Sequence, residues 1–190
     1  MALPPPSVAR QPLHRRVVQV EAFKRDDGLF DLEARLTDTK PFPVDLLSGR
    51  REAGDPVHDM VLRVTIDARY TIVGVEADPM RVPMPGTCEA VAPRYERLVG
   101  LNLLRDFRRQ VQARLGRTEG CTHLSELAAV LPTAALQSIA HLVRALDAPH
   151  PSEPPFFIGQ CHAYDRSGEV VRRHYPQWFV QADRTEKSDP

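Results

Sequence analysis

The chain has 190 residues, of which 42% are hydrophobic, so it is long enough to bury a core within one domain. Its 25 Lys and Arg residues balance 25 Asp and Glu residues and are interspersed with them, which argues against a nucleic-acid-binding surface. No apolar run is long enough to cross a bilayer, and Cys88, Cys121 and Cys161 without a secretory signal predict reduced thiols in a cytoplasm rather than a disulfide framework.

The first part of the chain predicts an antiparallel β-meander. Residues 1–12 lack the apolar core of a signal peptide and are expected to form a disordered lead-in. Strands are predicted over 16–24, 30–40, 57–66 and 70–77, and the turn sequence Asp26-Asp27-Gly28 indicates a hairpin between the first two. Residues 45–55 are expected to form a polar loop. We expect one face of this sheet to be buried.

The middle of the chain changes to helical periodicity. After a long loop over 78–93, short helices are predicted over 95–99 and 105–115. A long helix is predicted from Thr122, which suits an N-cap, and Glu126 lies in its first turn, where an acid favours the helix dipole. Its apolar residues recur at three- and four-residue steps. Pro132 lies inside this pattern and predicts a kink or two abutting helices.

The last part of the chain predicts a return to β structure. A proline-rich connector over 149–155 is followed by a predicted hairpin with strands over 156–164 and 170–175. The element order predicts an α+β fold, an antiparallel β-meander packed against a helical segment with a C-terminal β-hairpin returning to the sheet. We expect a single domain over 13–180 and a flexible tail over 181–190.

Polar residues continue the apolar rows of two predicted strands. The row that contains Leu36 runs on to Asp38 and Lys40, and the row that contains Met60 runs back to His58. Because side chains alternate across a strand, these polar groups are expected at the inner ends of core-facing rows. A buried charge or imidazole is costly unless it is paired or used, so this pattern predicts a pocket.

This group suggests acid–base catalysis. His58, oriented by Asp38 or by the adjacent Asp59, would act as a general base near neutral pH. Lys40 would stabilise the negative charge that develops on the substrate. The alternative is structural: Asp38 and Lys40 close a strand, and His58 satisfies a buried carbonyl.

The sequence Gly120-Cys121-Thr122-His123 begins the long predicted helix. Free N–H groups at a helix start can bind an anion or lower a thiol pKa, so Cys121 is a candidate nucleophile with His123 beside it. The alternative is a buried thiol that packs as a small apolar residue. The candidate substrate-binding residues come from this helix start, from the predicted hairpin and from the short helix predicted over 95–99. They are Tyr95, Cys121, His123, His162 and Tyr175.

A zinc site would have to draw on scattered ligands. Cys88, Cys121, His123, Cys161 and His162 are available, but they lack the short paired spacing typical of zinc sites. We therefore expect no metal. Six arginines between residues 94 and 114 have helical spacing with intervening acids, which is typical of a solvated face.

Several of these segments resemble a bacterial family, domain of unknown function 2889. The likeness is carried by Asp38-Thr39-Lys40, by the segment from His58 to Thr65, by the segment from Cys88 to Gly100, and by Gly120-Cys-Thr-His123 with Glu126 after it. It covers about residues 13–178. The resemblance implies an association with bacteria of broad catabolic repertoire, including that for aromatic compounds, and it carries over no site residues.

The expected function is a cytoplasmic, cofactor-independent enzyme that acts on a small aromatic or phenolic compound. The chain has no glycine-rich phosphate loop and no dinucleotide fingerprint, so acid–base groups would do the chemistry of a lyase or an isomerase. The expected partner is a small-molecule substrate, with no nucleic acid or membrane, and a homodimer is an option. Two alternatives stay open, namely a non-catalytic binding or accessory protein and a zinc-dependent hydrolase.

Overall fold

An antiparallel sheet organises the first part of the computed structural model, which describes residues 3–143, 154–155 and 157–181. Its strands lie in the order β1 (Arg15–Lys24), β2 (Phe30–Thr39), β5 (Pro56–Ile66) and β6 (Ile72–Arg81). The predicted meander is confirmed. The predicted loop over 45–55 is wrong in part, because β3 (Val44–Leu46) and β4 (Gly49–Arg51) pair as a small hairpin. Gly49 has a φ of 113°, a conformation that glycine adopts readily at such a turn.

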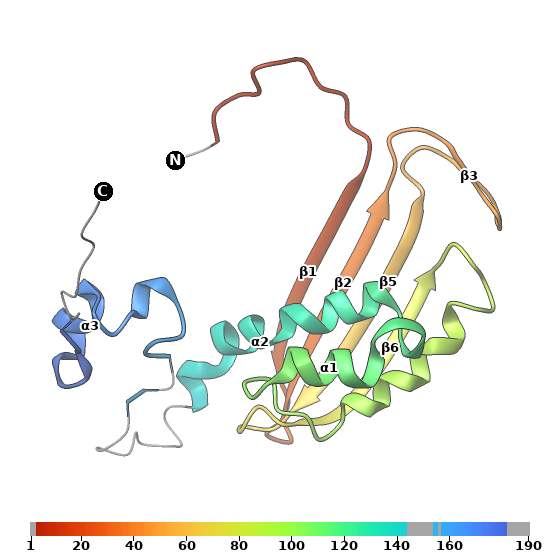
Figure 1. The fold of residues 1–190 in the computed structure, drawn as a ribbon. Helices are drawn as coiled ribbons and strands as arrows, with labels where there is room; N and C mark the ends of the chain where they lie inside the picture. Colours follow the sequence, from red (N-terminus) through yellow and green to blue (C-terminus); the bar gives the residue numbers. More distant parts are fainter. Residues whose placement is uncertain (1–2, 144–153, 156, 182–190) are drawn as a thin grey trace. The chain divides into compact units, whose positions relative to one another are not determined.

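The two faces of the sheet differ as strand alternation predicts. Leu32, Ala34 and Leu36 of β2 are fully buried, and Leu62, Val64 and Ile66 of β5 are buried beside them. Helices cover this face, as Figure 1 shows. The registers run without interruption from β1 to β2 and shift at Asp38/Thr39 between β2 and β5.

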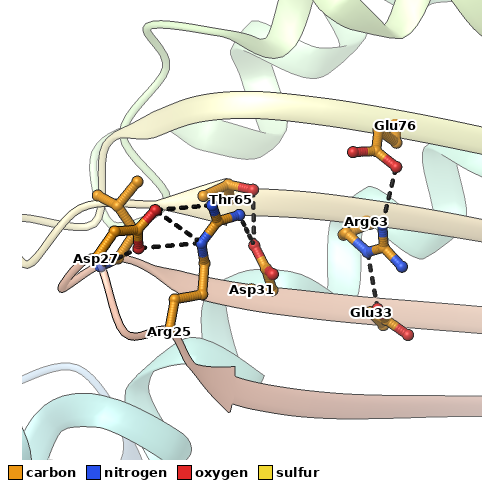
Figure 2. Close-up of polar contacts among 8 residues, drawn as sticks. Arg25, Asp27, Asp31, Glu33, Arg63, Thr65 and Glu76 are labelled. Atoms are coloured by element: carbon orange, nitrogen blue, oxygen red, sulfur yellow. Dashed lines mark hydrogen bonds and ion pairs between the residues drawn. The ribbon is translucent and has the colours of Figure 1, made fainter.

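The opposite face, here called the charged face, carries cross-strand ion pairs. Arg63 of β5 lies between two acids, with Nε 2.7 Å from Glu33 Oε1 and Nη1 2.8 Å from Glu76 Oε2 (Figure 2). The Thr65 hydroxyl donates to Asp31 Oδ1 at 2.7 Å. Such exposed pairs set register more than they add stability.

The helical part begins after β6. It comprises the 3₁₀ helices η1 (Glu89–Leu98) and η2 (Arg117–Glu119) and the α-helices α1 (Phe107–Leu115) and α2 (Thr122–Val143). The expected short helix at 95–99 is therefore the end of a longer 3₁₀ segment. Helix α2 continues through Pro132, so two separate helices do not form. Its buried side chains pack on the sheet beneath: Leu124, Leu127, Ala128, Leu131, Ala135 and Ile139.

The chain divides into two compact units, residues 1–143 and 144–190. In the second unit the predicted β-hairpin is wrong. Its described residues form η3 (His162–Tyr164), α3 (Glu169–His174) and η4 (Pro176–Trp178). Helix α3 has Glu169 in its first turn and three basic residues in its last turn, which favours a helix over a strand.

The predicted connector over 149–155, except residues 154–155, and the predicted tail beyond Gln181 lie outside the described residues. The expected lead-in is described from residue 3, and residues 3–12 form neither helix nor strand. The single domain expected over 13–180 spans both units and stays a prediction. Over the described parts of the chain, no helix is both long and apolar enough to cross a membrane.

Candidate functional site

Four elements bring polar side chains to one end of the sheet. Because β1, β2 and β5 alternate in direction, the start of β1, the end of β2 and the start of β5 meet at the same edge. Arg16 lies opposite Asp38, and Asp38 lies opposite His58, all on the helix-covered face. The first turn of α2 adds His123 above them.

Asp38 is the centre of this cluster. It is only 3% exposed. The Arg16 guanidinium donates from Nε to Oδ1 and from Nη2 to Oδ2, both at 2.8 Å. His14 Nε2 lies 2.8 Å from Oδ1, and His58 Nδ1 lies 3.1 Å from Oδ2. A bidentate arginine holds a carboxylate in a fixed orientation, so the two oxygens aim at defined partners.

These contacts keep Asp38 ionised. Burial alone would raise the pKa of Asp38, but the hydrogen bonds from Arg16 and His14 outweigh burial and lower that pKa from 3.8 to about 2. Arg16 also donates from Nη1 to Glu126 Oε2 at 2.5 Å, which links β1 to α2. The pKa of Arg16 is raised, chiefly by its hydrogen bond to Asp38.

Two imidazoles lie against each other above Asp38. The ring centroids of His58 and His123 are 3.8 Å apart with an angle of 32° between the planes. His123 Nε2 is 3.7 Å from Asp38 Oδ2. Burial and the electrostatic interaction with the neighbouring His123 ring lower the pKa of His58 below 6.5, although Asp38 opposes this shift. His58 is therefore neutral at pH 7, and its proton lies on Nδ1, where the carboxylate accepts it.

Cys121 lies next to this pair. Its Sγ is 3.9 Å from His123 Nδ1. Burial opposes ionisation of the thiol, but the contact with His123 and the N–H groups of Leu124 and His123 outweigh burial, so the pKa of Cys121 is lowered from 9.0. The sequence placed Cys121 and His123 correctly at the helix start, and the structure brings both to Asp38 and His58.

Tyr95 has a structural position rather than one that faces a ligand. It is fully buried. Its hydroxyl lies 2.7 Å from the Cys121 carbonyl oxygen and 2.9 Å from Ser125 Oγ, and it accepts from the Cys121 N–H at 3.0 Å. Burial raises the pKa of Tyr95. Tyr95 thus fixes the start of α2, and with it the positions of Cys121 and His123.

Two members of the expected catalytic set lie outside the cluster. Asp59 follows His58 directly and therefore faces the other side of the sheet, where Arg35 binds both of its oxygens at 2.8 and 2.6 Å. Lys40 lies beyond the register shift at Asp38/Thr39 and is half-buried. Its side chain makes no hydrogen bond or ion pair with the residues that the structure describes.

His162 and Tyr175 belong to the second unit. His162 is exposed and lines a surface hollow of ≈ 330 Å³ formed by residues of η3 and α3. Tyr175 packs edge-on against Phe157 at a centroid distance of 5.5 Å.

Sequence reasoning missed His14 and Arg16. Both share the phase of Val18, Val20 and Ala22, so the alternation that found Asp38 and His58 also indicates them. Their signal is weak because β1 is exposed along almost its whole length and has no clear buried row from which to count.

Asp38, His58 and His123 are also the group of described residues that could bind a metal ion. One ligand atom from each lies within 4.8 Å of the others. Two histidines and a carboxylate suit zinc or another transition metal. A bound ion would have to share the Asp38 carboxylate with Arg16, and the stacked imidazoles would have to open. Of the residues that the sequence offered as possible zinc ligands, only His123 is part of this group.

Comparisons with known proteins give a family and no activity. A family model described as protein of unknown function (DUF2889) matches residues 14–137. The match ends in α2, short of the likeness expected up to residue 178, and it includes His14, Asp38, His58 and His123. No curated protein matches the chain, and no solved structure does.

Proposed function

The chain belongs to the DUF2889 family, and from the geometry of its site we propose that it is a cytoplasmic enzyme that uses acid–base chemistry, without a cofactor, on a small aromatic or phenolic compound. Lyase or isomerase chemistry is the best candidate. The substrate class comes from the family resemblance, and the reaction type comes from the side chains available.

One observation carries the proposal: a neutral, half-buried imidazole held by an ionised carboxylate. Asp38 accepts the Nδ1 proton of His58 at 3.1 Å, so the lone pair of the neutral ring lies on Nε2. A carboxylate that fixes the tautomer and orientation of a histidine is the usual support of a general base. Arg16 and His14 are positioning residues, because they hold Asp38 and not the reacting atoms.

In the proposed reaction, His58 Nε2 removes a proton from the substrate. The protonated ring is stabilised by Asp38, and the proton returns either to another atom of the substrate or to a leaving group. His123 and Cys121 are the nearest groups for the second proton transfer, since His123 stacks on His58 and lies 3.9 Å from the thiol. Lys40 lies outside this cluster, and its role in stabilising the developing negative charge stays a prediction from the sequence.

The test uses exchange of substrate protons, because it needs no knowledge of the product. The purified protein is incubated in D₂O with a panel of phenolic acids and alcohols, and proton NMR follows both deuterium incorporation and turnover. We expect at least one compound to exchange. With that compound, His58→Gln should lower the rate by about 10²–10⁴-fold, which is the usual contribution of a general base.

The matched control is Glu76→Gln on the charged face, where the wild-type side chain is 73% exposed. This variant should keep the wild-type rate. Equal rates for His58→Gln and the control would contradict the assignment of His58. If no compound exchanges or turns over, the site favours the alternative of a binding or accessory protein.

A second candidate function is a metal-dependent hydrolase, favoured by the cluster of Asp38, His58 and His123. In that case the residues would hold a divalent ion that activates water. Elemental analysis of protein purified without chelators separates the candidates. One equivalent of zinc that is lost in both His58→Gln and His123→Gln would support the metal-dependent hydrolase and contradict a cofactor-independent site.

A further inference from the structure

The two edge strands of the main sheet, β1 and β6, differ in how well they are protected against pairing with a further strand. At the β6 edge, Pro79 cannot donate to a further strand, and the β5–β6 register shifts at two places. The residues after η1 also bond to the start of this edge, where the Ile72 N–H donates to the Leu101 carbonyl at 2.9 Å and the Gly100 N–H donates to the Ile72 carbonyl at 2.8 Å. These are the devices by which proteins prevent pairing of an edge.

The β1 edge has none of these devices. Its ten residues pair with β2 in an uninterrupted register and contain no proline. On its outer side, no backbone hydrogen bond to another described residue is present. Its exposed side chains include apolar ones, since Val17 is 40% exposed, Val18 43% and Phe23 46%. A long, regular edge without a proline or a bulge is a template for another strand.

We propose that β1 pairs antiparallel with β1 of a second copy of this chain, so that the two sheets join in one continuous sheet across a two-fold axis at Val18. The inference goes beyond the proposed function and does not depend on it. Along β1, every second residue points its backbone N–H and C=O groups away from β2, and only these residues can form hydrogen bonds with another strand. In an antiparallel pair such residues face each other, so even-numbered residues lie opposite even-numbered ones and odd opposite odd. A two-fold axis perpendicular to the sheet satisfies this condition.

Charge selects the register. With Val18 opposite its own copy, Arg15 of each chain lies opposite Glu21 of the other, twice by symmetry. Leu13, which is 68% exposed, then lies opposite Phe23. Shifting the pairing by two residues in either direction places Arg15 opposite Gln19 or Phe23, and a shift of four residues toward Lys24 places Arg16 opposite Lys24. The register centred on Val18 joins opposite charges.

Arg15 and Glu21 both lack an ion-pair partner among the described residues of their own chain. Both are exposed. Glu21 lies opposite Glu33 of its own β2, so its nearest cross-strand neighbour has the same charge. Pairing with a second copy supplies Glu21 with a cation and Arg15 with an anion. Like charges opposite each other destabilise a pair, and opposite charges stabilise it.

The experiment is a charge swap on the full chain. Dimerisation is measured by light scattering after size exclusion and by sedimentation over micromolar concentrations. Arg15→Glu and Glu21→Arg each turn two attractive pairs into two repulsive pairs, and each should weaken dimerisation by about tenfold or more. The double variant Arg15→Glu/Glu21→Arg restores both attractions and should recover the wild-type affinity. Circular dichroism checks that every variant keeps its fold.

Cross-linking tests the register independently. The background variant is Cys88→Ser/Cys121→Ser/Cys161→Ser, which removes the native thiols. In it, Val18→Cys should form a disulfide with its own copy, because residues that face each other at such an axis have Cα atoms about 4.5–5.5 Å apart. Gln19→Cys lies opposite residue 17 and should not cross-link. A monomeric wild type at high micromolar concentration would overturn the proposal. So would a dimer that neither charge variant weakens, or one that cross-links through position 19 and not through position 18.

Discussion

At the scale of the residue, Asp38 holds the candidate site together. It is almost fully buried and binds Arg16 and two histidines. Removing one partner of a buried ion pair leaves the others uncompensated. We therefore expect Asp38→Ala to lower the free energy of unfolding by about 3 kcal/mol, measured by urea denaturation at pH 7. Glu76→Ala on the exposed charged face should change it by less than about 0.5 kcal/mol. Equal losses in the two variants would contradict the central position of Asp38.

The same residue predicts how stability depends on pH. The pKa of Asp38 is about 2 in the folded chain against 3.8 ordinarily, so its contribution is complete above pH 3.8 and is lost as the pH falls toward 2. The contribution of Asp38 to the free energy of unfolding that is lost in this way is about 2 kcal/mol. The pKa of His58 is also lowered, so stability begins to fall already below pH 6.5. Urea titrations at several pH values should show both losses. Asp38→Asn should remove the loss at lower pH, and a wild-type profile in that variant would contradict it.

At the residue scale, the sequence predicted the side chains whose positions follow from the alternation of side chains along a strand alone. Alternation placed Asp38 and His58 on the core side because a continuous buried row precedes or follows each. The same rule places Asp59 on the other face, so its proposed role beside His58 conflicted with the parity argument itself. Lys40 lies after a register shift, which the sequence pattern does not reveal.

At the scale of the element, Tyr95 ties η1 to the start of α2. Its hydroxyl, fully buried, contacts the Cys121 backbone and Ser125. Tyr95→Phe leaves the Cys121 N–H and the Cys121 carbonyl without that partner, and we expect a loss of about 1–3 kcal/mol in the free energy of unfolding. Ser125→Ala removes one contact and should cost less. NMR shifts of His123 should change in Tyr95→Phe, and an unchanged His123 signal would contradict a positioning role for Tyr95.

Gly120 precedes the same helix, and its requirement is steric. A Cβ atom there would lie 2.4 Å from the Leu115 carbonyl oxygen and 3.1 Å from the Tyr95 hydroxyl oxygen. The first neighbour is backbone and cannot move aside alone. Gly120→Ala should therefore destabilise the chain by at least about 1–3 kcal/mol, as overpacking does. Thermal unfolding measures this, with Gly74→Ala as a comparison, because a Cβ atom there would meet only the Thr65 side chain at 3.5 Å and the backbone has no positive φ. A neutral Gly120→Ala would show that the loop can move.

Elements were predictable where a periodic pattern was long. The meander and α2 have repeated apolar positions, and both were found. The predicted C-terminal hairpin failed because short apolar segments fit either a strand or a helix. There, Gly168 before Glu169 and three basic residues at the end of α3 decide in favour of a helix. The 3₁₀ helix η1 contains Pro93, and the helix expected from the sequence began only after that proline.

At the scale of the whole molecule, the family match and the first compact unit coincide. The match covers residues 14–137, and the unit covers 1–143. The sheet, the helices that cover it and the cluster around Asp38 all lie within these limits. Among the described residues, the hydrophobic core cluster has 24 buried members, and all of them lie in this unit. A unit with its own core and site is expected to fold alone.

Truncation after residue 143 tests this independence. We expect the shortened chain, residues 1–143, to unfold cooperatively with a midpoint close to that of the full chain, because the buried core of the first unit is retained. It should also keep the loss of stability below pH 6.5 that His58 causes, since every residue around Asp38 is present. Calorimetry measures the midpoint, and urea titration measures the pH profile. A truncated chain that is unfolded, or that lacks this pH dependence, would contradict the independence of the first unit.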